Sequence, residues 1–219
     1  MEGVQRFEGE IAGLGTSAGV RVVLGMWRET PFGPIADAMI ERADGHRVLL
    51  APTAEVGDFV AATYRFDEVR VEPVGLFVDG VARTFVSDSL RVRFEVGART
   101  GVGRLLALVP QRLARARWWC RLVDPVARVV RRGVRTVGTA GNGRREYYCA
   151  TDEHRVTAVR ATLDGADLGS LRPVSPAVRF GFASTPPQPA VVEVTTWIAE
   201  PADRQPPARG AGATATAAG

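Results

Sequence analysis

The sequence predicts a mainly β fold, built as an antiparallel β-barrel or strongly curved sheet with a few helices. Asp-Gly pairs at 44–45, 79–80 and 164–165 each lie between apolar runs, which is the strongest short-range signal for a tight β-hairpin. Residues 90–96 alternate strictly between apolar and charged side chains, so this strand is expected to have one buried and one solvent-exposed face. Such strands favour antiparallel pairing over parallel strands with helical crossovers.

Two further stretches, 178–182 and 192–198, alternate in the same way around a proline-rich loop and predict a closing strand pair. Residues 13–19 have the glycine content of a phosphate-binding loop. However, the third glycine comes four residues after the second rather than three, and the following residues 20–24 are strand-like. We therefore expect a hairpin loop at this position.

Helical spacing is found in two places. Val56, Phe59 and Tyr64 recur with the period of a helix behind Thr53, a favourable N-cap residue, and predict a short helix near 54–64. The second place is a basic segment at 99–135.

This basic segment holds ten arginines and a single acid, Asp124, so it carries a net charge of +9 while the rest of the chain carries −5. Apolar residues recur at helical spacing from Pro110 onward and predict a first helix. A second helix is predicted by Asp124 as its cap, Pro125 in its first turn, and a basic end followed by the terminating Gly133. We expect two basic helices near 110–132.

The length of 219 residues and the 46% apolar content fit one domain with a substantial core. We expect a single β-rich domain at 1–199 with a helical insertion at 100–133. Residues 200–219 contain few large apolar side chains, so we expect a disordered tail there.

Composition excludes several kinds of site. All 28 basic residues are arginine, so Schiff-base and Walker-type lysine chemistry is excluded. His46 and His154 are the only histidines, which excludes a three-histidine zinc site, and we expect neither metal nor cofactor. Cys120 and Cys149 form neither a disulfide framework nor a zinc cluster, and we expect both to be reduced.

No apolar run approaches the roughly 18 to 20 residues that a membrane-spanning helix needs. Residues 1–8 lack the basic lead and apolar stretch of a secretory signal, so we expect a cytoplasmic location.

The basic helices offer the first candidate site. Guanidinium groups pair with phosphates and indole rings settle at the headgroup level of a membrane. We therefore expect an anion- or membrane-binding surface, peripheral at the inner membrane, formed by Arg112, Arg115, Arg117, Trp118, Trp119 and Arg121. An arginine-rich outer face over an ordinary core explains the pattern as well. Nucleic acid is a third alternative, supported by a pI near 9.8 but by no recognised motif.

The stretch 144–154 is the densest group of reactive side chains in the chain. On a regular strand Tyr148, Asp152 and His154 share one face, so a carboxylate could orient the imidazole while the phenol offers a second proton donor. The alternative is a polar strand end with an ordinary surface histidine.

The third candidate is a rigid aromatic turn at 27–37, in which Trp27, Phe32 and Asp37 could line the mouth of a pocket. The Gly-Pro turn in this stretch resembles the turn that precedes a strand in acetoacetate decarboxylase-like proteins. Because the chain has no lysine, the resemblance implies at most the fold and not that family's chemistry. The motifs Pro-Phe-Gly-Pro at 31–34 and the stretch 49–56 also resemble uncharacterised bacterial proteins of high-GC genomes.

Together these features predict a non-catalytic binding protein for an apolar or amphiphilic small molecule, with an association to anionic membranes. An enzyme that uses the Tyr148, Asp152 and His154 cluster is one alternative, and arginine-mediated binding of a polyanion such as nucleic acid is another. The oligomeric state stays open.

Overall fold

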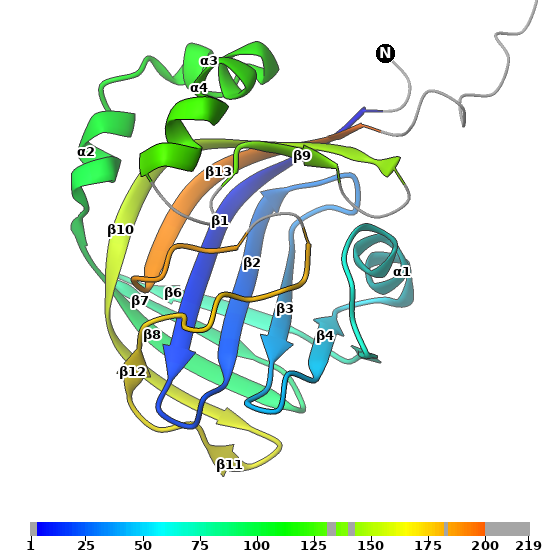
Figure 1. Ribbon diagram of the computed structural model, residues 1–219. Coiled ribbons are helices and arrows are strands. Elements are labelled where there is room, and N and C mark those ends of the chain that lie inside the picture. The colour runs from blue at the N-terminus through cyan, green and yellow to red at the C-terminus, as the bar shows by residue number, and fades with distance from the viewer. Residues whose placement is uncertain (1–3, 131–134, 140–142, 182–183, 200–219) are drawn as a thin grey trace, which may run out of the picture.

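The computed structural model describes residues 4–130, 135–139, 143–181 and 184–199. The chain forms a strongly curled sheet with a few helices, which confirms the predicted fold class (Figure 1). The predicted tail at 200–219 lies outside the described residues. The strands are β1 (Val4–Thr16), β2 (Arg21–Glu29), β3 (Ile35–Glu41), β4 (Arg47–Ala51), β5 (Glu68–Val71), β6 (Gly75–Asp79), β7 (Ala82–Val86), β8 (Leu90–Arg99), β9 (Val137–Thr139), β10 (Arg145–Leu163), β11 (Ala166–Asp167), β12 (Leu171–Arg172) and β13 (Ala190–Ala199).

The strand order is β5-β4-β3-β2-β1-β13-β10-β8-β7-β6, with β9 and β11 paired to β10 and β12 paired to β1. All pairs are antiparallel except β4 with β5. The three Asp-Gly hairpins are confirmed: Gly45, Gly80 and Gly165 have positive φ angles of 90°, 55° and 79°. The glycine-rich stretch 13–19 is a hairpin between β1 and β2, also as predicted.

The two faces of the sheet at β1, β2 and β3 contact different parts of the protein. Alternate residues such as Leu14, Leu24 and Ile40 point into the main core, where they meet Phe85 and Phe94 from β7 and β8. The intervening residues of β1 to β3 point to the other face, away from this core. That second face, together with the same face of β13, forms the floor of the pocket described below.

Helix α1 (Ala54–Thr63) confirms the predicted helix, and the Thr53 hydroxyl caps it by accepting a hydrogen bond from the backbone N–H of Val56 at 3.3 Å. The described part of the basic segment forms three helices instead of two: α2 (Gly101–Leu106), α3 (Gln111–Ala114) and α4 (Arg117–Val130). Among the described residues, no helix is long and apolar enough to cross a membrane.

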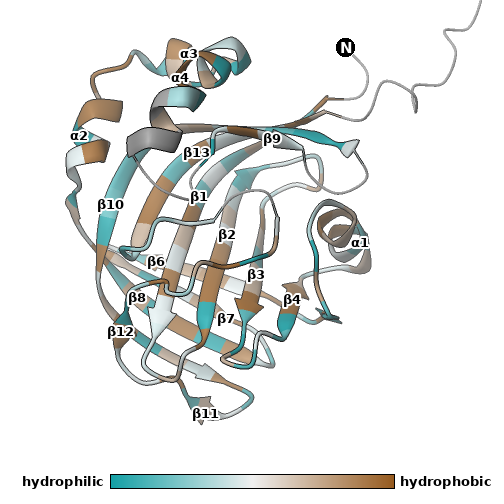
Figure 2. Cartoon of the chain, viewed as in Figure 1, coloured by the Kyte–Doolittle hydropathy of each residue, from teal (hydrophilic) through white to brown (hydrophobic). Residues whose placement is uncertain are grey.

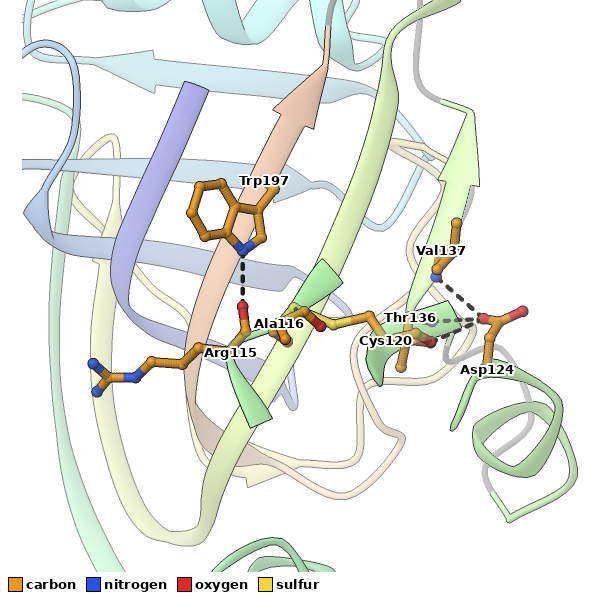
Figure 3. Close-up of a disulfide and its surroundings, with 8 residues drawn as sticks. Arg115, Ala116, Cys120, Asp124, Thr136, Val137 and Trp197 are labelled. Carbon is orange, nitrogen blue, oxygen red and sulfur yellow. Dashed lines mark hydrogen bonds between the residues drawn. A yellow bond between two sulfur atoms is a disulfide. The ribbon is translucent and has the colours of Figure 1, made fainter. Parts of the chain in front are cut away.

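The predicted second basic helix does not begin at Asp124, because α4 runs through Asp124 and Pro125. The Asp124 carboxylate is buried and accepts hydrogen bonds from the backbone N–H groups of Thr136 and Val137 at 2.9 and 3.1 Å (Figure 3). It therefore fixes the chain that returns to β9 rather than capping a helix. The predicted end of this helix at Gly133 lies outside the described residues.

The helices α2 to α4 stand beside the long strand β10. One edge of β10 pairs with β9 up to Tyr147 and with β8 only from His154 onward, so no strand of the described residues pairs with the edge between them. The helical segment, which joins β8 to β9 in the chain, occupies this part of the edge, and both α2 and α4 contact β10 (Figure 1). The helical segment therefore covers the part of the β10 edge that no described strand pairs with.

The predicted strand at 178–182 is wrong for its described part, because residues 178–181 form no strand. The chain crosses in front of the sheet here, as Figure 1 shows, and uses Val178 and Phe180 to pack against Val23 of β2. The backbone N–H of Arg179 donates to the buried carboxylate of Glu41 at 2.8 Å, in place of a strand partner. The predicted strand at 192–198 is confirmed as part of β13, which pairs with β1 and β10.

The prediction that both cysteines are reduced is also wrong, because Cys120 and Cys149 form a disulfide (Figure 3). It ties α4 to β10 across 29 residues of sequence, with a Cα–Cα distance of 5.7 Å. The indole N–H of Trp197 on β13 donates to the carbonyl of Arg115, between α3 and α4, at 3.1 Å and also holds the helical segment to the sheet.

Candidate functional site

A pocket of about 460 Å³ lies on the face of the sheet that is turned away from the main core. Strands β1, β2, β3, β10 and β13 form its floor, and α1, the helices α2 to α4 and the segment that crosses in front of the sheet form its walls. Its volume is in the range of pockets that hold small organic ligands. Most of its lining is apolar, and this lining includes Phe7, Ile11, Val23, Phe59, Val60, Leu106, Trp119, Val123, Val192 and Val194.

Four aromatic rings form one wall of the pocket. The ring of Phe59 stacks on Phe7 with centroids 5.4 Å apart and meets the edge of Phe32 at 5.3 Å. Trp27 packs edge-on against Phe7 at 5.6 Å. Trp27, Phe32 and Asp37, which the sequence marked as ligand-binding candidates, thus lie together in the pocket lining. That they bind a ligand stays a prediction.

The pocket has a polar end made by Tyr64, Glu146 and Tyr148. The Tyr64 hydroxyl donates to Oε1 of Glu146 at 2.5 Å and lies 3.1 Å from the Tyr148 hydroxyl. Tyr64 follows α1, whereas Glu146 and Tyr148 lie on the same face of β10. Burial raises the pKa of both tyrosines well above the usual value, and the Glu146 carboxyl adds to this.

Three buried polar atoms of the described pocket residues have no hydrogen-bond partner: Oε2 of Glu146 and the hydroxyl oxygens of Thr185 and Thr196. Thr196 on β13 is the register partner of Tyr148 on β10, so it lies beside the polar end. An unsatisfied buried polar group costs about 1–3 kcal/mol, so proteins rarely leave one without a partner. The unpartnered atoms of Glu146 and Thr196 therefore lie together at the polar end, whereas Thr185 lies against Gly13, six positions along β1 from Phe7, the register partner of Thr196.

Two carboxyl groups in the pocket lining ionise with difficulty. Burial raises the pKa of Glu146 to about 7 although Tyr64 donates to it, and burial raises the pKa of Asp37 to about 7 although the Trp27 indole donates to it at 3.0 Å. Of the described lining residues, only Arg135 is basic, and its side chain is exposed. Around pH 7 each of these two carboxyl groups is therefore about half ionised and can both donate and accept a proton.

The expected grouping of Tyr148 with Asp152 and His154 on one face is wrong. A β-bulge between Ala150 and Asp152 inserts one extra residue into β10, which reverses the alternation of its side chains. Tyr148 lines the pocket, whereas Asp152 and His154 are not among the lining residues. Asp152 instead holds Arg99 in an ion pair of 2.7 Å and lies 3.4 Å from Nε2 of His154, on the other face of the strand.

The structure divides the six residues of the predicted basic surface. Arg112, Arg117, Trp118 and Arg121 are exposed. Arg115 instead pairs with Glu8 at 2.8 Å, and Trp119 lines the pocket. Among these exposed side chains, Arg121 also donates to the hydroxyl of Tyr147 at 2.6 Å.

Tyr64 and Glu146 were not predicted from the sequence as site residues. Tyr64 was expected only as an apolar position of the predicted helix, and Glu146 was expected on the same strand face as Tyr148, Asp152 and His154 but was given no role of its own. The one available signal was the i, i+2 spacing of Glu146 and Tyr148 within that stretch. Across the parts of the chain that the structure describes, no three His, Cys, Asp or Glu side chains gather as metal ligands.

Comparison with known proteins adds little to this geometry. No family model and no curated protein matches the chain. Among solved structures, the chain is similar to an acetoacetate decarboxylase from Legionella pneumophila, with a TM-score of 0.43 and 9% sequence identity over 90% of this chain and 85% of that one.

Proposed function

We propose that the protein binds an apolar or amphiphilic small molecule in the pocket between the sheet and α1 to α4. The observation that carries this proposal is the set of unpartnered buried atoms at the polar end, above all Oε2 of Glu146 and the hydroxyl of Thr196. The apolar part of the ligand would lie against Phe7, Phe59 and their neighbours, and its polar group would meet these atoms.

The polar group of the ligand is an uncharged oxygen function, a hydroxyl or a carbonyl. A carboxylate would bring a negative charge beside Glu146 and Asp37, which themselves ionise near pH 7. The one basic side chain of the described lining, Arg135, is exposed and so does not compensate such a charge deep in the pocket. A protonated Glu146 can donate a hydrogen bond to a carbonyl, and its ionised form can accept one from a hydroxyl.

Native mass spectrometry of freshly purified protein tests whether an apolar ligand is retained. A titration then compares a long-chain alcohol with the fatty acid of equal length at pH 8, each displacing the neutral fluorophore N-phenyl-1-naphthylamine. We expect the alcohol to displace the probe at a concentration at least tenfold lower than the fatty acid. Equal displacement by both would contradict the uncharged polar end.

A pair of variants on β10 locates the binding. Ala150→Trp fills the pocket lining, whereas Ala158→Trp adds the same side chain at an exposed position of the same strand. We expect the first variant to lose probe binding and the second to keep it. If both variants bind the probe like the wild type, the ligand does not occupy this pocket and the proposal fails.

Acid-base catalysis on the bound molecule is the second candidate function. Glu146 and Asp37, with pKa values near 7 in an apolar pocket, have the property that proton transfer to or from carbon requires. Incubation of a bound ketone in D₂O separates the two functions. An enzyme that moves protons at carbon leaves deuterium in the recovered ketone and loses this activity in Glu146→Gln, whereas a carrier returns the ketone unlabelled.

A further inference from the structure

The outer sides of α2 to α4 expose large apolar side chains to solvent. Leu105 and Leu108, at the end of α2 and just beyond it, are 65% and 79% exposed. Trp118 and Leu122 lie one turn apart on α4 and are 58% and 62% exposed. Large apolar groups gathered on one side of a protein mark a surface that contacts a partner or a membrane. Figure 2 shows apolar stretches on these helices, which stand together beside one end of the sheet.

Arginines accompany these apolar residues, and this segment of the sequence contains only one acid. Arg104, Arg112, Arg117 and Arg121 are all exposed. From residue 99 to 135 the only acid in the sequence is Asp124, which is 6% exposed and accepts hydrogen bonds from Thr136 and Val137. The surface is thus both apolar and positively charged, and it complements a partner that is both apolar and negatively charged.

We propose that the outer face of α2 to α4 docks on an anionic lipid membrane. The exposed leucines and Trp118 would enter the boundary between headgroups and acyl chains, and the arginines would pair with lipid phosphates. Nucleic acid explains the arginines but gives the exposed leucines no apolar partner. Without a spanning helix among the described residues, the attachment is peripheral and reversible.

The same helices connect this surface to the pocket. Leu105 lines the pocket and is also 65% exposed, so α2 stands where the pocket opens to solvent. On α4, Trp119 and Val123 line the pocket while their neighbours Trp118 and Leu122 point outward. Docking therefore brings the pocket opening to the bilayer, and an apolar ligand can pass between them without crossing water. This last step rests on the proposed ligand binding, whereas the docking itself does not.

Vesicle sedimentation tests the docking, with vesicles of phosphatidylcholine alone and with 30% phosphatidylglycerol. We expect binding to the anionic vesicles only, with a loss at high salt because exposed charges are screened within about 8 Å at physiological ionic strength. The variant Trp118→Ser with Leu122→Ser and the variant Arg104→Gln with Arg112→Gln should each lower the partition coefficient about tenfold or more. Circular dichroism confirms that each variant is folded.

Two controls make the same changes elsewhere. Phe77→Ser with Val81→Ser removes exposed apolar groups from the β6–β7 hairpin, and Arg91→Gln with Arg93→Gln removes exposed arginines from β8. Both controls should bind vesicles like the wild type. Equal loss in helix variants and controls would refute the docking face. Binding of double-stranded DNA that is insensitive to the Trp118 and Leu122 changes, without vesicle binding, would refute it as well and identify a polyanion surface.

Failure of docking and failure of ligand binding give different results. Displacement of the neutral fluorophore is measured without vesicles and reports the pocket alone. If the protein binds the probe but not the vesicles, the membrane inference is wrong and the proposed function stands. If it binds the vesicles but not the probe, the proposed ligand binding is wrong and the membrane inference stands.

Discussion

The buried carboxyl of Glu146 makes the stability of the protein depend on pH in a defined direction. Burial raises its pKa from the ordinary 4.5 to about 7 in the folded state. The folded protein therefore holds this proton more tightly than the unfolded chain, and the stabilisation present below pH 4.5 is lost as the pH rises through about 7. At about 1.36 kcal/mol per pKa unit, the loss amounts to about 3 kcal/mol, and the side chain is too deeply buried for solvent to screen it.

The variant Glu146→Gln keeps the shape and the hydrogen bond from Tyr64 but cannot ionise. Urea unfolding at pH 5 and pH 8 should show the variant within about 1 kcal/mol of the wild type at pH 5 and about 3 kcal/mol more stable at pH 8. Glu95→Gln, at an exposed position on β8, is the control and should show no such change. A difference between Glu146→Gln and wild type that is the same at both pH values would refute the reasoning.

Three further substitutions test other parts of the structure. Cys120→Ser opens the disulfide, whose 29-residue span predicts a loss of about 3–4 kcal/mol in unfolding free energy, and without reductant the wild type should show no reactive thiol. Gly25→Ala places a Cβ about 2.4 Å from the Asp37 carboxylate, so it should weaken probe binding severalfold in a fluorescence titration. Arg21→Met removes a 2.9 Å partner of the fully buried Glu41, which keeps Arg179 as its second partner, and should cost about 1.5–3 kcal/mol in urea unfolding; a loss below about 0.5 kcal/mol would contradict this.

The fold was predictable where local chemistry decides the backbone. Each Asp-Gly pair needs a positive φ that glycine adopts without strain, so three hairpins could be located without knowing what surrounds them. Thr53 caps α1 through its own side chain, which is again a local effect. The strand prediction for 178–181 was wrong because the alternating pattern there reflects contacts with Val23 and Glu41, which are far away in sequence, and not pairing with another strand.

The candidate site was predictable only in part, because its residues come together through long-range contacts. Trp27, Phe32 and Asp37 are close in sequence and were found as one turn. Tyr64 and Glu146, which share a hydrogen bond, are separated by 82 positions and carry no joint sequence signal. The disulfide between Cys120 and Cys149 depends in the same way on how α4 lies against β10.

The bulge in β10 explains why the predicted orientation of His154 was wrong and why Glu153 faces the pocket. Before it, Glu146 and Tyr148 point into the pocket; after it, Glu153 takes the pocket side and Asp152 and His154 turn outward. The Glu153 side chain accepts from the hydroxyl of Thr100 at 2.5 Å, and its carbonyl accepts from the Thr100 N–H at 3.0 Å, so the start of α2 is fixed at the turned strand. Without the extra residue, Glu153 would point away from Thr100. One inserted residue thus puts Glu153 instead of Asp152 on the pocket side of β10, and through Thr100 it also positions α2, the helix at the pocket opening.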